Sequence, residues 1–291
     1  MPCAIVNPRV KNHRIFFLLA IIGNKRRRAF VDHEFFARGV VLPCLFLALA
    51  GCGRGGDEVP GGGGIVTMAP HLTEVVFALG AGDRLVGVGA FCDYPQQVKN
   101  EVNEGGYIDP DLEKLALLSP DLLILPGKHE AVSEFAALRG LDVLNVHMDD
   151  FATIDAGIAE IGKALEVPGE ADALRARVEE ELAEVAAAVA GLPQPKVLII
   201  TTRRSHDLDT LYTAGGKSFV GEIVTLAGGG NIHEDAPRPY FEASKETIVV
   251  AAPDVILEFH CGEELDAAEE AAFKADWNML KNVPAVQNGR R

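Results

Sequence analysis

Reactive and aromatic side chains follow the predicted strands of this chain, one strand after another. The positions directly after a strand are Pro70, His71, Phe91, Cys92, Asp93, Tyr94, Lys128, His129, Arg203, Arg204, Ser205, His206, His260 and Cys261. In open α/β sheets, ligands bind beyond the carboxyl ends of the strands, where the loops converge. We therefore expect these positions to line one ligand site.

Four histidines among these positions suggest a metal-bearing ligand. His71 and His129 lie in the first half of the chain, and His206 and His260 lie in the second half. Imidazole suits Fe, Co or Zn, and a haem or metal chelate can receive an axial His. The spacing contains no short ligand motif, so ordinary loop histidines are the alternative. No intrinsic cofactor is expected, because the metal complex would be the ligand itself.

Three basic side chains belong to the same strand ends. Lys128, Arg203 and Arg204 would place positive charge on the rim of an acidic protein. Such charges can bind an anionic chelate. The alternative is that each is a solvated surface charge.

Two segments of the sequence repeat one another, 133 residues apart. The segment DLEKLALLSPDLLIL starts at Asp111 and the segment SKETIVVAAPDVILE starts at Ser244, which aligns Glu113 with Glu246. Each segment begins with an N-cap residue, and each predicted helix ends at a Pro-Asp pair before an apolar strand. The pattern predicts two copies of one helix–turn–strand unit.

A second pair of similar segments supports the repeat. TEVVFALGAG at 73–82 is similar to GEIVTLAGGG at 221–230, and Glu74 aligns with Glu222. Strands alternate with helices in both halves, so the sheets should be mainly parallel. Helices are expected at 74–79, 130–138, 151–165 and 217–227, and a loop is expected at 202–216.

One long amphipathic helix is expected to join the two halves. Between Glu170 and Ala190 there is no Gly or Pro, and apolar residues recur every three or four positions at Leu174, Val178, Leu182, Val185 and Val189. This spacing is typical of a helix with one apolar face. The predicted fold is therefore α/β, with two Rossmann-like lobes at 65–168 and 195–291 and a bridging helix at 169–191.

The first 56 residues are expected to be a leader and the start of a tether. Arg38 precedes an apolar run of about a dozen residues, a pattern typical of a signal peptide and too short for a spanning helix. The run ends in Leu-Ala-Gly-Cys52, which resembles the bacterial lipobox, so Cys52 is the expected lipidation site. An uncleaved anchor is the alternative. Residues 1–30 precede this complete signal, and translation is expected to start later, near Val31.

Composition limits the class of partner and reaction. The net charge is −15, which argues against nucleic-acid binding because that function needs clustered Lys and Arg. The sequence has neither a Gly-rich phosphate loop nor a G-x-S-x-G nucleophile motif. Asp93 with a nearby His would be the acid/base pair of an enzyme, and no spacing supports such a pair. A binding protein is therefore favoured over an enzyme acting in the same cleft.

The sequence resembles the substrate-binding proteins of ABC importers for cobalamin, ferric siderophores and haem, the class with a helical backbone. The residues that carry the resemblance are the lipobox, the CDYP loop at 92–95, the segment LYTAGGKSFVGEIVTLAGGGNI at 211–232 and the paired Glu-bearing helices. The resemblance covers residue 64 to the end. Members of this family continue with a strand and a last helix after a segment like Asn288–Arg290, so terminal elements are expected to be missing here.

The resemblance implies a ligand, a partner and a location. Tyr107, Tyr212 and Tyr240 match positions where cobalamin-binding members present aromatic rings, so cobalamin is the leading ligand, with ferric siderophore, haem or metal ion as the alternative. Glu113 and Glu246 match acidic positions that meet Arg pockets on an ABC permease dimer with its ATPase subunits. The protein would be a monomer outside the cytoplasm, in the periplasm, held to the membrane only by its lipid. The alternative is that both glutamates merely complement helix dipoles.

Overall fold

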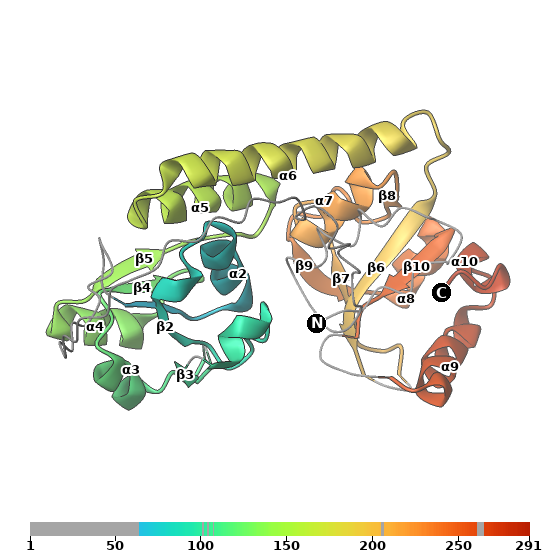
Figure 1. Cartoon of the computed structure of the whole chain (residues 1–291). Helices are drawn as coiled ribbons and strands as arrows, with labels where there is room; N and C mark the ends of the chain where they lie inside the picture. Colours follow the sequence, from blue (N-terminus) through green and yellow to red (C-terminus); the bar gives the residue numbers. More distant parts are fainter. Residues whose placement is uncertain (1–63, 101, 104, 107, 205–206, 261–264) are drawn as a thin grey trace, which may run out of the picture.

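A computed structural model describes residues 64–291 except 101, 104, 107, 205–206 and 261–264. Two α/β lobes lie side by side, and the long helix α6 (Pro168–Val189) runs over both of them (Figure 1). Five predicted site residues lie outside the described residues, as does the leader at 1–56. They are Cys52, Tyr107, Ser205, His206 and Cys261.

The first lobe contains a five-stranded sheet with only parallel pairs, in the order β3-β2-β1-β4-β5. Its strands are β1 (Ile65–Thr67), β2 (Leu85–Val88), β3 (Val102–Asn103), β4 (Leu122–Leu125) and β5 (Asp142–Asn145). Its helices are α2 (Pro70–Ala78), α3 (Leu112–Leu118), α4 (Glu130–Arg139) and α5 (Phe151–Ala164), with short 3-10 turns at Gly82–Arg84 and Gln96–Asn100. The predicted parallel sheet is confirmed for this lobe.

Alternate residues of the central strands pack into two hydrophobic cores, one on each face of the sheet. Ile65 and Ile124 pack in the core that includes residues of α2, α5 and α6. Val66 and Leu123 pack in the core that includes residues of α3 and α4. A parallel sheet has to bury both faces, which explains the continuous apolar runs of β1 and β4.

The second lobe contains a mixed sheet in the order β10-β6-β7-β9, with β8 paired to β6. Its strands are β6 (Lys196–Arg203), β7 (Leu211–Ala214), β8 (Gly230–Asn231), β9 (Tyr240–Ala243) and β10 (Val255–Glu258). Its helices are α7 (Phe219–Leu226), α8 (Lys245–Ala251), α9 (Ala267–Asp276) and α10 (Pro284–Gln287), with a 3-10 turn at Trp277–Leu280.

The prediction of mainly parallel sheets is wrong for half of this lobe. β7 pairs antiparallel with both β6 and β9, and it occupies part of the segment expected to be a loop at 202–216. Only the few residues after Arg203 separate β6 from β7. So short a connection suits an antiparallel pair, because a parallel pair needs a crossover of a dozen or more residues.

Helix α6 links the lobes by packing against an element of each. It contacts α5 of the first lobe and α7 of the second. Leu174 is buried in the first lobe's core, and Val178 packs against the same core. None of the helices in the described ranges combines the length and apolar character that a membrane span requires.

The repeated unit is confirmed by matching caps. The Asp111 carboxylate accepts a hydrogen bond from the Lys114 N–H at the start of α3, and the Ser244 hydroxyl accepts one from the Thr247 N–H at the start of α8. Each helix ends with a left-handed residue, Ser119 at φ 43° and Ala252 at φ 51° in the second copy. The two copies therefore share a side-chain cap at the N-terminus of the helix and a left-handed residue at its C-terminus.

Arg203, predicted to face a ligand, lies instead in the core of the second lobe. Its side chain is 1% exposed and forms ion pairs with Glu258 (2.5 Å) and Asp276 (2.9 Å). Its guanidinium carbon lies 4.7 Å from the centre of the Phe273 ring, and the Trp277 indole N–H donates to Glu258 at 2.9 Å. The predicted ligand-binding role of Arg203 is therefore wrong, because partly buried carboxylates already neutralise its charge. These ion pairs join β6, β10 and α9.

Replacing Arg203 with Ala is expected to lower the free energy of unfolding by about 3–5 kcal/mol, because two partly buried carboxylates lose their cation. Urea unfolding followed by circular dichroism measures this change. Arg204→Ala, at the exposed next position, is the matched control and should change stability by less than about 0.5 kcal/mol. Equal stability of the two variants would contradict a structural role for Arg203.

Candidate functional site

The first lobe gathers its predicted site residues along one edge of the sheet. Because β2, β1, β4 and β5 are adjacent and parallel, their carboxyl ends lie side by side. The residues that follow them are Pro70 and His71 after β1, Phe91, Asp93 and Tyr94 after β2, and Lys128 and His129 after β4. Phe91, Tyr94 and Lys128 are exposed at this edge. The sequence-based grouping is thus consistent with the topology of this lobe.

His71 lies in the first turn of α2, which begins at Pro70 and not at Glu74 as expected. Pro fits the first helical position because its missing N–H has no partner there in any case. His71 is partly buried, and burial lowers its pKa, while the negative charge of Asp149 opposes that shift. His71 is therefore neutral at physiological pH and has an imidazole lone pair to offer.

Glu74 is a buried carboxyl group one turn further along α2. It is 8% exposed, and its Oε2 atom has no hydrogen-bond partner among the residues described. Burial raises the pKa of Glu74 to about 8, and the charge of Asp93 adds to the shift. Glu74 is thus protonated at neutral pH, because a buried carboxylate without a partner is costly.

Two exposed tyrosines of the second lobe share one face of its sheet. Tyr212 of β7 pairs with Glu242 of β9, and Tyr240 lies two residues before Glu242 on the same strand. Since side chains alternate along a strand, all three point to the same side. Burial raises the pKa of Tyr240, the charge of Asp149 adds to this shift, and the Ser218 hydroxyl opposes it. This face therefore lies near the end of β5 in the first lobe.

The lobes meet directly where α5 and α7 begin. The Phe219 N–H donates to the Asp149 carbonyl oxygen at 3.0 Å, and the Phe151 N–H donates to Glu222 Oε2 at 2.7 Å. The Phe151 and Phe219 rings pack edge to face, with centroids 5.6 Å apart. This contact brings Asp149 within electrostatic reach of His71 from one lobe and Tyr240 from the other.

Sequence reasoning missed Glu74, Glu222 and Asp149 as residues of this region. Asp149 follows β5 by a few residues. Its place after a strand could therefore have identified it, as it did the other predicted site residues. Its neighbour His147 lies 3.9 Å from the Asp149 carboxylate. The two glutamates were aligned by the repeat, but their burial and partners carry no signal in the sequence.

The described members of the predicted metal set, His71, His129 and His260, do not form a metal-binding group. Among the described residues, no three or more His, Cys, Asp or Glu side chains are placed to hold a metal ion. His129 caps α4, where its Nδ1 accepts the Val132 N–H at 3.3 Å. His260 lies 3.3 Å from Glu258 and packs against the Phe273 ring. His129 and His260 therefore have structural contacts. Of the described histidines in the predicted set, His71 is the one influenced by Asp149 at the contact between the lobes.

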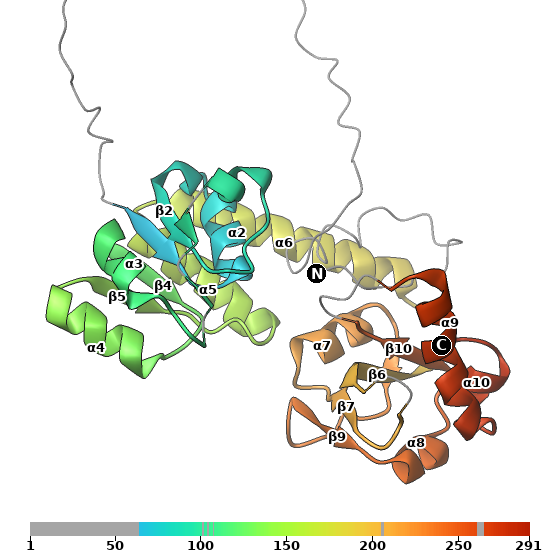
Figure 2. The same ribbon diagram turned by 90° about the horizontal axis from the view of Figure 1, so that it is seen from below.

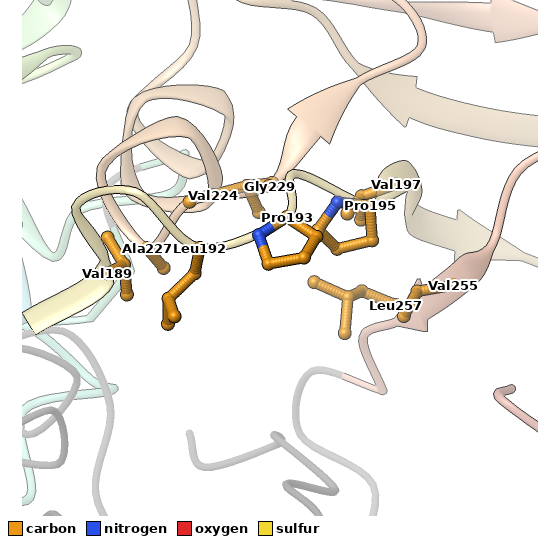
Figure 3. A pocket seen from close by; sticks show the side chains of 11 residues that line it. Val189, Leu192, Pro193, Pro195, Val197, Val224, Ala227, Gly229, Val255 and Leu257 are labelled. Carbon is orange, nitrogen blue, oxygen red and sulfur yellow. The ribbon is translucent and has the colours of Figure 1, made fainter.

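An apolar pocket of about 240 Å³ lies elsewhere, at the opposite end of the second sheet (Figure 3). Val197 near the start of β6 and Val255 at the start of β10 line the pocket, together with Val189 at the end of α6. Ligands of α/β sheets bind at the carboxyl ends of strands. This pocket is therefore not the candidate site.

The two glutamates expected to dock on a permease are exposed, one on each lobe. Glu113 lies in the first turn of α3 and Glu246 in the first turn of α8. Seen from below, α3 and α8 belong to separate lobes at the two sides of the molecule (Figure 2). Their geometry is compatible with contacts to two separate points of a partner.

Comparisons with known proteins identify relatives. Residues 65–291 match the model of the periplasmic binding protein family. The chain is 25% identical over 228 residues to the vitamin B12-binding protein of Vibrio campbellii, covering 77% of this chain and 78% of the relative. Among solved structures, a periplasmic haem-binding protein of Vibrio cholerae (TM-score 0.69) and the vitamin B12-binding protein of the same organism (TM-score 0.61) are each 24% identical. They cover 78% and 79% of this chain, and 88% and 86% of their own chains, and so show the fold.

The raised pKa of Glu74 predicts how stability depends on pH. The folded protein keeps this proton up to about pH 8, while the unfolded chain loses it near pH 4.5. The free energy of unfolding should therefore fall as the pH rises between these values. Glu74→Gln, which carries no titrating proton, is expected to match the parent protein near pH 5 and to exceed its stability on the order of a few kcal/mol near pH 9.

Thermal unfolding at both pH values measures this difference. Glu134→Gln, at an exposed position of α4, is the control and should leave the pH dependence unchanged. A Glu74→Gln variant whose stability follows the parent at both pH values would show that Glu74 titrates normally in the folded protein.

Proposed function

Because the chain belongs to the periplasmic binding protein family, we propose that it captures cobalamin between its lobes and delivers it to an ABC permease. The family implies an extracytoplasmic protein that pairs with an ABC transporter and binds a small molecule. Its relatives include vitamin B12-binding proteins. The observation that carries the proposal is the set of exposed aromatic rings on the two lobes.

Four aromatic side chains are exposed among the described residues, and all four belong to the predicted site. Phe91 and Tyr94 come from the first lobe, and Tyr212 and Tyr240 come from the second. Between 41% and 71% of each is accessible. Exposed aromatic rings bury a large area against a flat macrocycle at a low cost in side-chain entropy. A corrin ring between the lobes would be contacted from both sides.

The charges of the region suit a ligand that is recognised by its surface area. Arg203 is neutralised inside the second lobe, and Glu74 is protonated. Lys128 and Arg204 are basic and exposed, and they would contact the phosphate of a corrinoid. A polyanionic ferric chelate would call for more positive charge than the described site offers.

Haem or a ferric siderophore is the second candidate ligand. The solved relatives include haem-binding proteins. His71 has a lowered pKa, and a neutral imidazole can coordinate the iron of a haem. Coordination by one His would distinguish this ligand from a cobalamin held by aromatic contacts.

Membrane attachment and docking complete the proposal. Cys52, outside the described residues, would carry the lipid, and the Gly-rich residues 53–64 would connect it to the first lobe. Glu113 and Glu246 would each meet a basic pocket on one permease subunit. The helix α6 and the contact between α5 and α7 would limit how far the lobes close on the ligand.

A titration of residues 57–291 against cobalamin, haem, a ferric hydroxamate and Zn²⁺ tests the ligand. Tight one-to-one binding of cobalamin is expected. Tryptophan fluorescence and visible absorption measure the binding. Tyr212→Ala and Tyr240→Ala should each weaken binding about tenfold, equal to about 1.4 kcal/mol. Leu138→Ala, at an exposed position away from the site, is the control. Preferential binding of haem that is lost in His71→Ala would replace cobalamin with haem.

The docking role of the two glutamates has its own test. The double variant Glu113→Ala/Glu246→Ala is expected to abolish uptake of cobalamin into proteoliposomes that contain the permease and ATPase subunits, while the cobalamin Kd stays unchanged. Two charge-assisted contacts are lost, each typically worth about 1.5–3 kcal/mol. Glu130→Ala/Glu234→Ala, at exposed positions outside the repeat, is the matched control. Normal uptake by the docking variant would contradict the proposal.

A further inference from the structure

Each docking helix carries an exposed aliphatic side chain one turn after its glutamate. Leu117 follows Glu113 by four residues on α3, and Val250 follows Glu246 by four residues on α8. Residues four apart lie on the same face of a helix. Both Leu117 and Val250 are 86% exposed. Each lobe thus presents a carboxylate and an apolar group side by side.

These side chains are not needed by their own lobes. The apolar residue that anchors α3 to its core is Leu115, and the one that anchors α8 is Ile248, both with no exposed surface. Leu117 and Val250 point away from the cores that these residues join. Their exposure therefore has no structural benefit within the chain.

The repeat relation separates this pair from ordinary surface leucines. Single exposed apolar residues are common and call for no explanation. Leu117 and Val250, however, lie 133 residues apart, the same offset that relates Glu113 to Glu246. The residue 133 positions after exposed Leu138 is Ala271, so Leu138 has no large apolar counterpart in the repeat. Only a partner with two equivalent contact points would use such a matched pair.

We propose that Leu117 and Val250 are apolar anchors of the permease interface, each inserting into a recess beside the basic pocket for the neighbouring glutamate. This inference rests on the proposed docking function of Glu113 and Glu246. A two-fold permease dimer offers the same recess twice, and the pseudo-repeat offers the anchor twice. Burying an aliphatic side chain at the centre of an interface adds affinity that a rim charge alone does not supply.

A lipid surface fits this patch less well than a protein recess. Each anchor lies one turn from an exposed glutamate, and the chain has a net charge of −15. Anionic bilayers repel such a surface, because membrane-binding segments use Lys and Arg. In the second lobe Val249 is also exposed and enlarges the apolar contact beside Val250.

The test compares two double variants of the anchors and the variant Glu113→Ala/Glu246→Ala, all in the full chain, for binding to the permease–ATPase complex in nanodiscs. Leu117→Ser/Val250→Ser is expected to raise the Kd for the complex at least tenfold, with the cobalamin Kd and the melting temperature unchanged. The conservative variant Leu117→Met/Val250→Ile should bind like the parent. Leu192→Ser, an exposed leucine on the connection after α6, is the control.

The outcomes separate the anchors from the glutamates. Parent-like binding of the Ser variant, together with lost binding of Glu113→Ala/Glu246→Ala, would overturn the anchors and leave the docking proposal standing. Parent-like binding of both variants would overturn the docking faces altogether. Binding of the parent to protein-free vesicles of anionic lipid, lost in the Ser variant, would assign the patch to the membrane and also overturn the inference.

Discussion

The backbone N–H of Phe151 at the start of α5 needs an acceptor, and it finds one on the other lobe. The first N–H groups of a helix have no partner within the helix, and the Glu222 carboxylate supplies one at 2.7 Å. The Phe219 N–H returns a bond to the Asp149 carbonyl oxygen. With α6 running over both lobes, this contact fixes where the strand ends of one lobe lie relative to the tyrosine face of the other.

The same junction shows how the two halves of a repeat acquire different roles. Glu74 and Glu222 are aligned in the sequence, yet Glu74 is buried with a raised pKa and Glu222 reaches across to α5. A carboxyl group buried without a hydrogen-bond partner keeps its proton, whereas Glu222 accepts a backbone N–H from the other lobe. The repeat therefore preserves the position of the group, and the surroundings decide its burial and its partner.

The distribution of charge explains why aromatic contact dominates the proposed site. Arg203 joins three elements of the second lobe through ion pairs with Glu258 and Asp276. Its positive charge is therefore buried in the lobe and does not face the proposed ligand site. The surface that remains between the lobes combines exposed rings with a few peripheral charges. Such a surface suits recognition of a large ligand by shape and area, and the proposed docking glutamates of α3 and α8 lie apart from it.

The sequence by itself determined the repeat, the caps of α3 and α8, the long helix and the ends of β1, β2 and β4. These features depend on apolar spacing and on residues within a few positions of one another, so local physics is sufficient. Tertiary structure alone decided that Arg203 and His260 point into a core, that β7 runs antiparallel, and that Glu222 caps a helix 71 residues away. A strand end shows where a side chain begins, but its direction and charge depend on which distant groups pack against it, and no short segment of sequence contains those groups.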